Sequence, residues 1–183
     1  MEKPVELPVM FRREWAMPNK YTFEITPIRE FISTHMYEVC HERIDRGDST
    51  TKMEIVDPFC GNSTIGTVRN DIRVSGIDSA IWLINVPDNF ADVVLFDPPY
   101  TPRQKKECYE DIGVHLSDTK ASYWATLRNQ ITRITKPSGR VLSFGYNSVG
   151  IGKKRGFSLI DGLLVCHGGQ HNDTICVAEV KMS

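Results

Sequence analysis

The sequence predicts an α/β domain built on a mostly parallel sheet with a C-terminal antiparallel hairpin. Short apolar segments alternate with stretches of helical periodicity, which is the pattern of βαβ units. The run Val93–Phe96 has no polar interruption, as is typical of a strand buried on both faces. Near the C-terminus, two extended segments at 158–166 and 174–181 flank a short glycine-containing stretch, which predicts the hairpin.

The composition fits one soluble domain over residues 1–183. Hydrophobic residues make up 40% and charged residues 25% of the chain, enough for a real core. A net charge of -1 excludes a polybasic mode of nucleic-acid binding, so such contacts would use local patches. No apolar run approaches the ~18 residues of a membrane span. Five cysteines without a CxxC pair argue against structural zinc and disulfides, so we expect a cytoplasmic protein with no membrane or metal partner.

The N-terminal part holds one clear helix. Residues 1–26 contain three prolines and are expected to form an irregular arm that packs on the domain through its aromatic side chains. Thr26-Pro27 is a typical helix start, because a hydroxyl cap precedes proline at the first helical position. Apolar residues at helical spacing then predict a helix over residues 27–44.

The remaining elements follow from apolar patterns between turn signals. A second helix is expected at 123–134, ending before the proline and glycine of residues 136–139. The hairpin would place one antiparallel edge on the sheet. Extended segments are expected at 53–56, 65–70, 74–77, 91–96 and 140–144.

Acidic residues follow four of the predicted strands: Asp57, Asp71, Asp78 and Asp97. Ligands of open α/β sheets bind beyond these carboxyl ends, although a lone aspartate there is more often a turn or helix cap. Asp97 differs because it opens Asp97-Pro98-Pro99-Tyr100, whose prolines donate no N–H group and have fixed φ angles. The loop therefore offers a carboxylate, a carbonyl and an aromatic ring, which suits a planar ligand that carries an amino group.

Asp97-Pro98-Pro99-Tyr100 resembles the catalytic motif of the amino-methyltransferases that modify adenine N6 or cytosine N4 in DNA. Asp57-Pro58-Phe59-Cys60-Gly61 resembles the S-adenosyl-L-methionine (SAM) motif of that family, and Pro27–Ile32 resembles a further cofactor-contacting segment. The similarity spans residues 18–181, in a layout like that of small phage and prophage adenine-specific DNA methylases. The first motif alone also occurs in RNA guanine-N2 methyltransferases, whereas the two motifs at this separation are specific.

The resemblance implies a Rossmann-like SAM-dependent methyltransferase domain without a separate target-recognition domain. An acidic residue would bind the ribose hydroxyls of SAM. Asp71 is favoured for that role and Asp78 for a place near the adenine, but the reverse stays open because the usual helix between the first two strands would be nearly absent. The methionine end of SAM would be held by Asp57, Phe59, Cys60, Gly61 and Asn62.

The same resemblance implies direct methyl transfer to a base flipped out of the DNA duplex. Tyr100 would stack on the base, while Asp97 and the Pro98 carbonyl would accept the two amine hydrogens. Adenine N6 is favoured because the motif begins with aspartate. The alternatives are cytosine N4, an RNA guanine-N2 or adenine methyltransferase, and a catalytically silent SAM- or DNA-binding subunit.

Three weaker features have a functional and a structural interpretation. Cys60 is expected to be a small loop residue and not a nucleophile, since no base adjoins it. His167 and His171 fall in a Gly-Gly turn and are expected to form a substrate-side or structural loop, not a metal site.

Without a recognition domain, we expect a short DNA target or a homodimer. Two basic clusters could contact phosphates or simply be solvated: Arg103, Lys105 and Lys106, and Lys153, Lys154 and Arg155.

Overall fold

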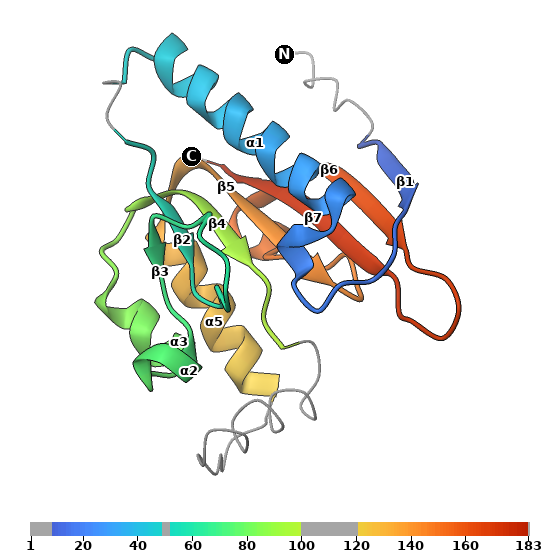
Figure 1. Ribbon diagram of the computed structural model, residues 1–183. Helices are drawn as coiled ribbons and strands as arrows, with labels where there is room; N and C mark the ends of the chain where they lie inside the picture. The colour runs from blue at the N-terminus through green and yellow to red at the C-terminus, as the bar shows by residue number, and fades with distance from the viewer. Residues whose placement is uncertain (1–8, 49–51, 100–120, 183) are drawn as a thin grey trace.

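The computed structural model describes residues 9–48, 52–99 and 121–182 (Figure 1). Its sheet contains seven strands in the order β1-β6-β7-β5-β4-β2-β3. Neighbouring strands are parallel, except that β7 is antiparallel to both β5 and β6. The predicted α/β class, the mostly parallel sheet and the C-terminal antiparallel hairpin are therefore confirmed.

The elements have the following bounds. The strands are β1 (Phe11–Trp15), β2 (Ile55–Asp57), β3 (Val68–Arg69), β4 (Ala91–Phe96), β5 (Thr135–Gly145), β6 (Phe157–Cys166) and β7 (Thr174–Lys181). The α-helices are α1 (Thr26–Asp45), α2 (Ile72–Ser75), α3 (Ser79–Trp82) and α5 (Ala121–Ile134). Short 3-10 turns are η1 (Thr22–Glu24), η2 (Leu83–Asn85) and η3 (Lys153–Arg155).

Helices cover both faces of the sheet (Figure 1). On one face, α1 packs Phe31 and Ile32 in one apolar cluster with Val93 of β4. On the other face, α5 packs Leu127 in a second cluster with Val94 of β4. All six residues of β4 are buried, because alternate side chains of a strand enter opposite layers. This confirms the prediction of a strand buried on both faces.

Two local predictions were wrong. Residues 74–77 were expected to be extended, but the chain forms α2, because the Asp71 side chain accepts a hydrogen bond from the Arg73 N–H group (2.8 Å) and Gly76 ends the helix at φ 70°. The N-terminal arm was expected to be irregular, but β1 is a strand that runs parallel to β6. The partner of β1 lies far away in sequence, so no local pattern announced it.

The position of the antiparallel strand also differs from the prediction. The hairpin was expected to form an antiparallel edge, but β7 inserts between β6 and β5. The described sheet ends at β1 on one side and at β3 on the other. Strand β7 is therefore an inner strand of the sheet, where for example its Ala178 lies opposite Leu142 of β5.

Strands β2 and β4 mark a change of direction across the sheet. The chain passes from β2 to its outer neighbour β3, whereas β4 is followed by β5 on the opposite side. Loops that leave the carboxyl ends of β2 and β4 therefore diverge, and open α/β sheets bind ligands in the crevice between such loops. Asp57 ends β2 and Asp97 directly follows β4, so both residues stand at this crevice.

Candidate functional site

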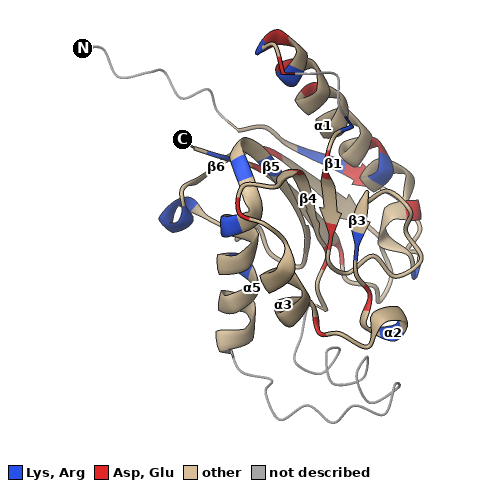
Figure 2. Ribbon diagram, turned by 90° about the vertical axis from the view of Figure 1, so that its left-hand side faces the viewer, with Lys and Arg blue, Asp and Glu red and all other residues tan. Residues whose placement is uncertain are grey.

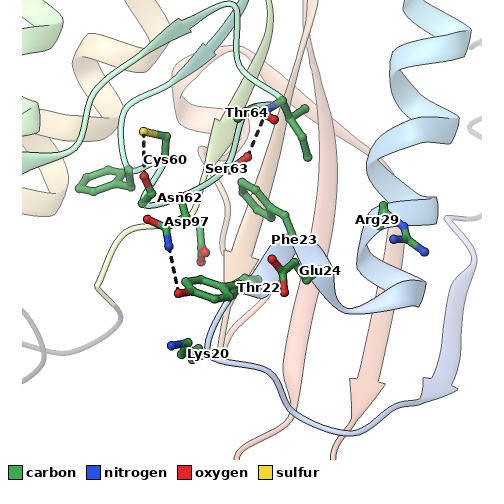
Figure 3. A pocket seen from close by; sticks show the side chains of 14 residues that line it. Lys20, Thr22, Phe23, Glu24, Arg29, Cys60, Asn62, Ser63, Thr64 and Asp97 are labelled. Carbon is green, nitrogen blue, oxygen red and sulfur yellow. Dashed lines mark hydrogen bonds between the residues drawn. The ribbon is translucent and has the colours of Figure 1, made fainter. Parts of the chain in front are cut away.

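A cavity of about 320 Å³ lies at this crevice (Figure 3). One wall is the loop after β2, residues 59–65, and the opposite wall comprises residues 20–24 and Arg29 of α1. Asp97 completes the lining from the end of β4. The volume is at the lower end of the range for small-molecule sites.

Five predicted site residues line the cavity: Phe59, Cys60, Gly61, Asn62 and Asp97. Pro98 instead lines a neighbouring cavity of about 80 Å³, together with Trp124 and Ser143. Pro99 follows it and is partly buried. Tyr100, Arg103, Lys105 and Lys106 lie outside the described residues. The structure therefore brings Asp97 and four residues of the loop after β2 together at one cavity.

Asp57 lies beneath the loop and does not line the cavity. It is fully buried, and its Oδ1 accepts a hydrogen bond from the Phe59 N–H group (3.2 Å). Its Oδ2 is buried without a hydrogen-bond partner among the described residues. Burial raises the pKa of the Asp57 carboxyl from 3.8 to about 7, with the Phe59 hydrogen bond opposing the rise and the Asp97 carboxylate adding to it.

Asp71 braces the loop from the outside. Its Oδ2 accepts a hydrogen bond from the Gly61 N–H group (3.1 Å), while its Oδ1 caps α2. Gly61 has φ 50°, a conformation that glycine adopts at little cost. The carboxylate thus fixes the shape of the cavity wall, and its direct contact with a ribose stays a prediction.

Asp78 connects α3 to α5. Its Oδ1 accepts a hydrogen bond from the Ala80 N–H group (2.8 Å), which caps α3. Its Oδ2 accepts a hydrogen bond from the Tyr123 hydroxyl (3.0 Å). Asp78 does not line the cavity, so its expected place near an adenine also stays a prediction.

The wall formed by residues 20–24 was missed as a site by sequence reasoning. The Asn62 amide donates a hydrogen bond to the Tyr21 hydroxyl (2.9 Å), and this bond joins the two walls (Figure 3). The Lys20 ammonium lies over the Tyr21 ring, 4.7 Å from its centroid. From the predicted segment Pro27–Ile32, Arg29 lines the cavity. The aromatic residues of the arm were the available signal, but they were assigned to packing alone.

The cavity combines opposite charges with aromatic surfaces. Lys20 and Arg29 contribute cations, and Glu24 and Asp97 contribute acidic side chains. Three aromatic residues also line it: Tyr21, Phe23 and Phe59. A zwitterionic ligand that also has a planar, largely apolar part would find a counterpart for each of its groups.

Cys60 shows no sign of an activated nucleophile. Burial raises the pKa of its thiol, and the nearby Asp57 and Asp71 carboxylates raise it further. A raised pKa keeps the sulfur protonated and weakly nucleophilic near neutral pH. The structure therefore agrees with a small loop residue at this position.

His167 has a structural environment. Its Nδ1 lies 2.9 Å from the Ala16 carbonyl oxygen and its Nε2 lies 3.0 Å from the Thr174 hydroxyl. Its backbone N–H group donates to Asp173 (3.0 Å). Both ring nitrogens are thus engaged, and no cluster of metal-ligating side chains occurs among the residues that the structure describes.

The second basic cluster lies away from the cavity. It forms η3, which directly precedes β6 (Figure 2). Because β6 runs in the same direction as β4, the start of β6 lies at the amino ends of the parallel strands, whereas Asp97 lies at their carboxyl ends. Arg155 also donates a hydrogen bond to Asn129 of α5 (2.9 Å). The structure does not bring Lys153, Lys154 and Arg155 to the candidate site.

No protein-family model matches the chain, and no curated protein matches it either. Within the described part of the chain, no helix is long and apolar enough to cross a membrane.

Proposed function

We propose that the protein transfers a methyl group from SAM to the exocyclic amine of a flipped base in DNA, with adenine N6 as the preferred acceptor. The observation that carries this proposal is the convergence of the Phe59–Asn62 loop and Asp97 on one cavity. The mostly parallel sheet with helices on both faces supports a Rossmann-like methyltransferase fold.

The residues of the cavity fit SAM in charge and shape. Lys20 or Arg29 would bind the carboxylate of its methionine part, and Glu24 would bind the ammonium group. The buried Asp57 carboxylate has an unpaired oxygen, which is costly unless a positive group lies nearby. When bound, SAM supplies a methyl group on a positively charged sulfur, and that charge would favour the ionised form of Asp57.

The protein's part in transfer is to position the amine. The Asp97 carboxylate and the Pro98 carbonyl would each accept a hydrogen bond from one N–H group of the amine, which directs the nitrogen lone pair toward the cavity. Pro98 cannot donate a hydrogen bond from its own nitrogen, so the loop presents acceptors without a competing donor there. Holding the nitrogen in an attacking geometry supplies a large part of the acceleration, and no covalent enzyme intermediate is needed.

Labelled SAM and nucleoside analysis test this function. We expect label in N6-methyladenine of DNA, whereas label in cytosine N4, or in guanine N2 or adenine of RNA, would identify an alternative substrate. SAM binding without any labelled product would indicate a silent SAM-binding subunit. Both DNA and RNA are therefore incubated with the same preparation.

Asp97→Asn is the matching variant, because it keeps the shape of the side chain and removes its charge. We expect transfer to fall on the order of 100-fold while SAM binding, measured by calorimetry, persists. Asp45→Asn on the exposed end of α1 is the control and should transfer at the wild-type rate. Wild-type transfer by Asp97→Asn would refute the assigned role of Asp97.

A further inference from the structure

Strand β1 forms an exposed end of the sheet. It pairs with β6 on one side, and among the described residues no strand adjoins its other side (Figure 1). Phe11 lies over Gly162 but remains 49% exposed, and Trp15 at the other end of β1 is 64% exposed. An edge with exposed aromatic residues is a surface on which another strand can add.

The backbone of β1 presents a defined set of groups on its outer side. The Ala16 N–H group donates to the Cys166 carbonyl of β6 (3.1 Å). Backbone groups alternate in direction along a strand, so those of Arg12 and Glu14 also face β6. The N–H and C=O groups of Phe11, Arg13 and Trp15 consequently face outward.

The sequence of β1 is complementary to itself in the antiparallel direction. A second copy centred on Arg13 places Phe11 opposite Trp15 and Arg12 opposite Glu14. The outward-facing residues 11, 13 and 15 then form the hydrogen-bonded pairs of an antiparallel ladder. Aromatic pairs and pairs of opposite charge are the favourable cross-strand combinations.

The side chains of β1 are arranged for this pairing. Arg12 donates to Asp161 of β6 (2.9 Å) on the face that α1 covers, and the remaining N–H groups of its guanidinium are the donors for the partner's Glu14. Glu14 has no hydrogen bond or ion pair with any described residue, so its carboxylate can accept a partner. Arg13 donates from Nε to the Cys166 sulfur (3.2 Å), which directs its guanidinium back toward β6 and away from the second Arg13.

We propose that β1 docks on β1 of a second copy of this chain, producing a two-fold dimer with one sheet continuous across both copies. The charge complementarity of Arg12 and Glu14 selects a second copy as the occupant. The contact is short, so the dimer is weak and concentration-dependent. This inference is independent of the proposed methyl transfer, because it uses no residue of the cavity.

Sedimentation of the whole chain over about 10 µM to 1 mM tests the dimer, since weak association occurs in this range. The weight-average mass should rise from 20.8 kDa toward twice that value. Glu14→Lys should weaken association at least tenfold, because it sets an ammonium group opposite the Arg12 guanidinium. Glu30→Lys makes the same charge change on an exposed site of α1 and should associate like the wild type.

Two further experiments separate pairing from folding. Arg13→Pro removes an outward N–H group that β6 does not use, so the monomer should keep its far-ultraviolet circular dichroism while losing the dimer. Arg12→Glu and Glu14→Lys should each remain monomeric alone but associate when mixed, because the mixture restores both charge pairs. A wild type that stays monomeric throughout, or a Glu14→Lys or Arg13→Pro variant that dimerises like the wild type, would overturn the proposal.

Discussion

The buried Asp57 makes the stability of the protein depend on pH in a specific direction. The pKa of its carboxyl is about 7 in the folded chain against an ordinary value of 3.8. The folded state therefore binds the proton more tightly than the unfolded state between these values. Stability from this group is full below pH 3.8, falls as the pH rises, and is lowest above about pH 7.

Asp57→Asn removes the charge and keeps an acceptor for the Phe59 N–H group. A rise from 3.8 to about 7 corresponds to roughly 4 kcal/mol, at about 1.4 kcal/mol per pH unit. Relative to the wild type, the variant should therefore gain up to about 4 kcal/mol of unfolding free energy between acidic and alkaline pH. The hydrogen bond from the Phe59 N–H group is already contained in this difference, because it lowers the pKa of the carboxyl against the effect of burial.

Urea denaturation of the ligand-free protein, at several pH values from about 4 to 8, measures this difference. Asp45→Asn, an exposed carboxyl on α1, controls for the loss of one charge and should differ little from the wild type across the range. A difference between Asp57→Asn and the wild type that stays constant with pH would refute the reasoning. It would show that Asp57 is not buried as an isolated acid.

Two other variants examine the cavity walls and the basic cluster. Tyr21→Phe removes the hydroxyl that accepts a hydrogen bond from Asn62, and the affinity for SAM measured by calorimetry should fall about fivefold. Tyr37→Phe on the exposed face of α1 is the control. Equal affinities of the two variants would show that the contact between the walls does not contribute to SAM binding. Because η3 lies at the amino ends of the parallel strands and Asp97 at their carboxyl ends, Lys153→Ala should leave the salt dependence of DNA affinity unchanged. A shallower slope would restore Lys153 as a phosphate contact.

The sequence pattern predicted those elements whose buried residues form a recognisable pattern within a short stretch of the chain. Strand β4 has the bounds expected for it, since consecutive apolar residues leave no solvent-facing side. The helix predicted over 27–44 matches α1 within one residue at each end, because Pro27 and the helical spacing mark it. Strand β1 could not be predicted in the same way, since its pairing with β6 is a contact between distant parts of the chain.

The candidate site was predictable on one wall. The motif residues from Phe59 to Asn62 and Asp97 were found because strand ends and proline-rich loops are visible in the sequence. Lys20 and Tyr21 were not found, because their approach to the loop after β2 depends on how the arm folds back. The ribose contact expected of Asp71 stays a prediction; in the structure its carboxylate accepts a hydrogen bond from the Gly61 N–H group, a role that a strand-end aspartate serves equally well.

The most direct test of the central claim is the identity of the methylated nucleoside. Purified protein is incubated with labelled SAM and DNA, and the DNA is digested to nucleosides for chromatography and mass spectrometry. The proposed function predicts label in N6-methyladenine, at a level on the order of 100-fold lower when Asp97→Asn replaces the wild type. SAM binding without transfer to any DNA or RNA base would contradict it.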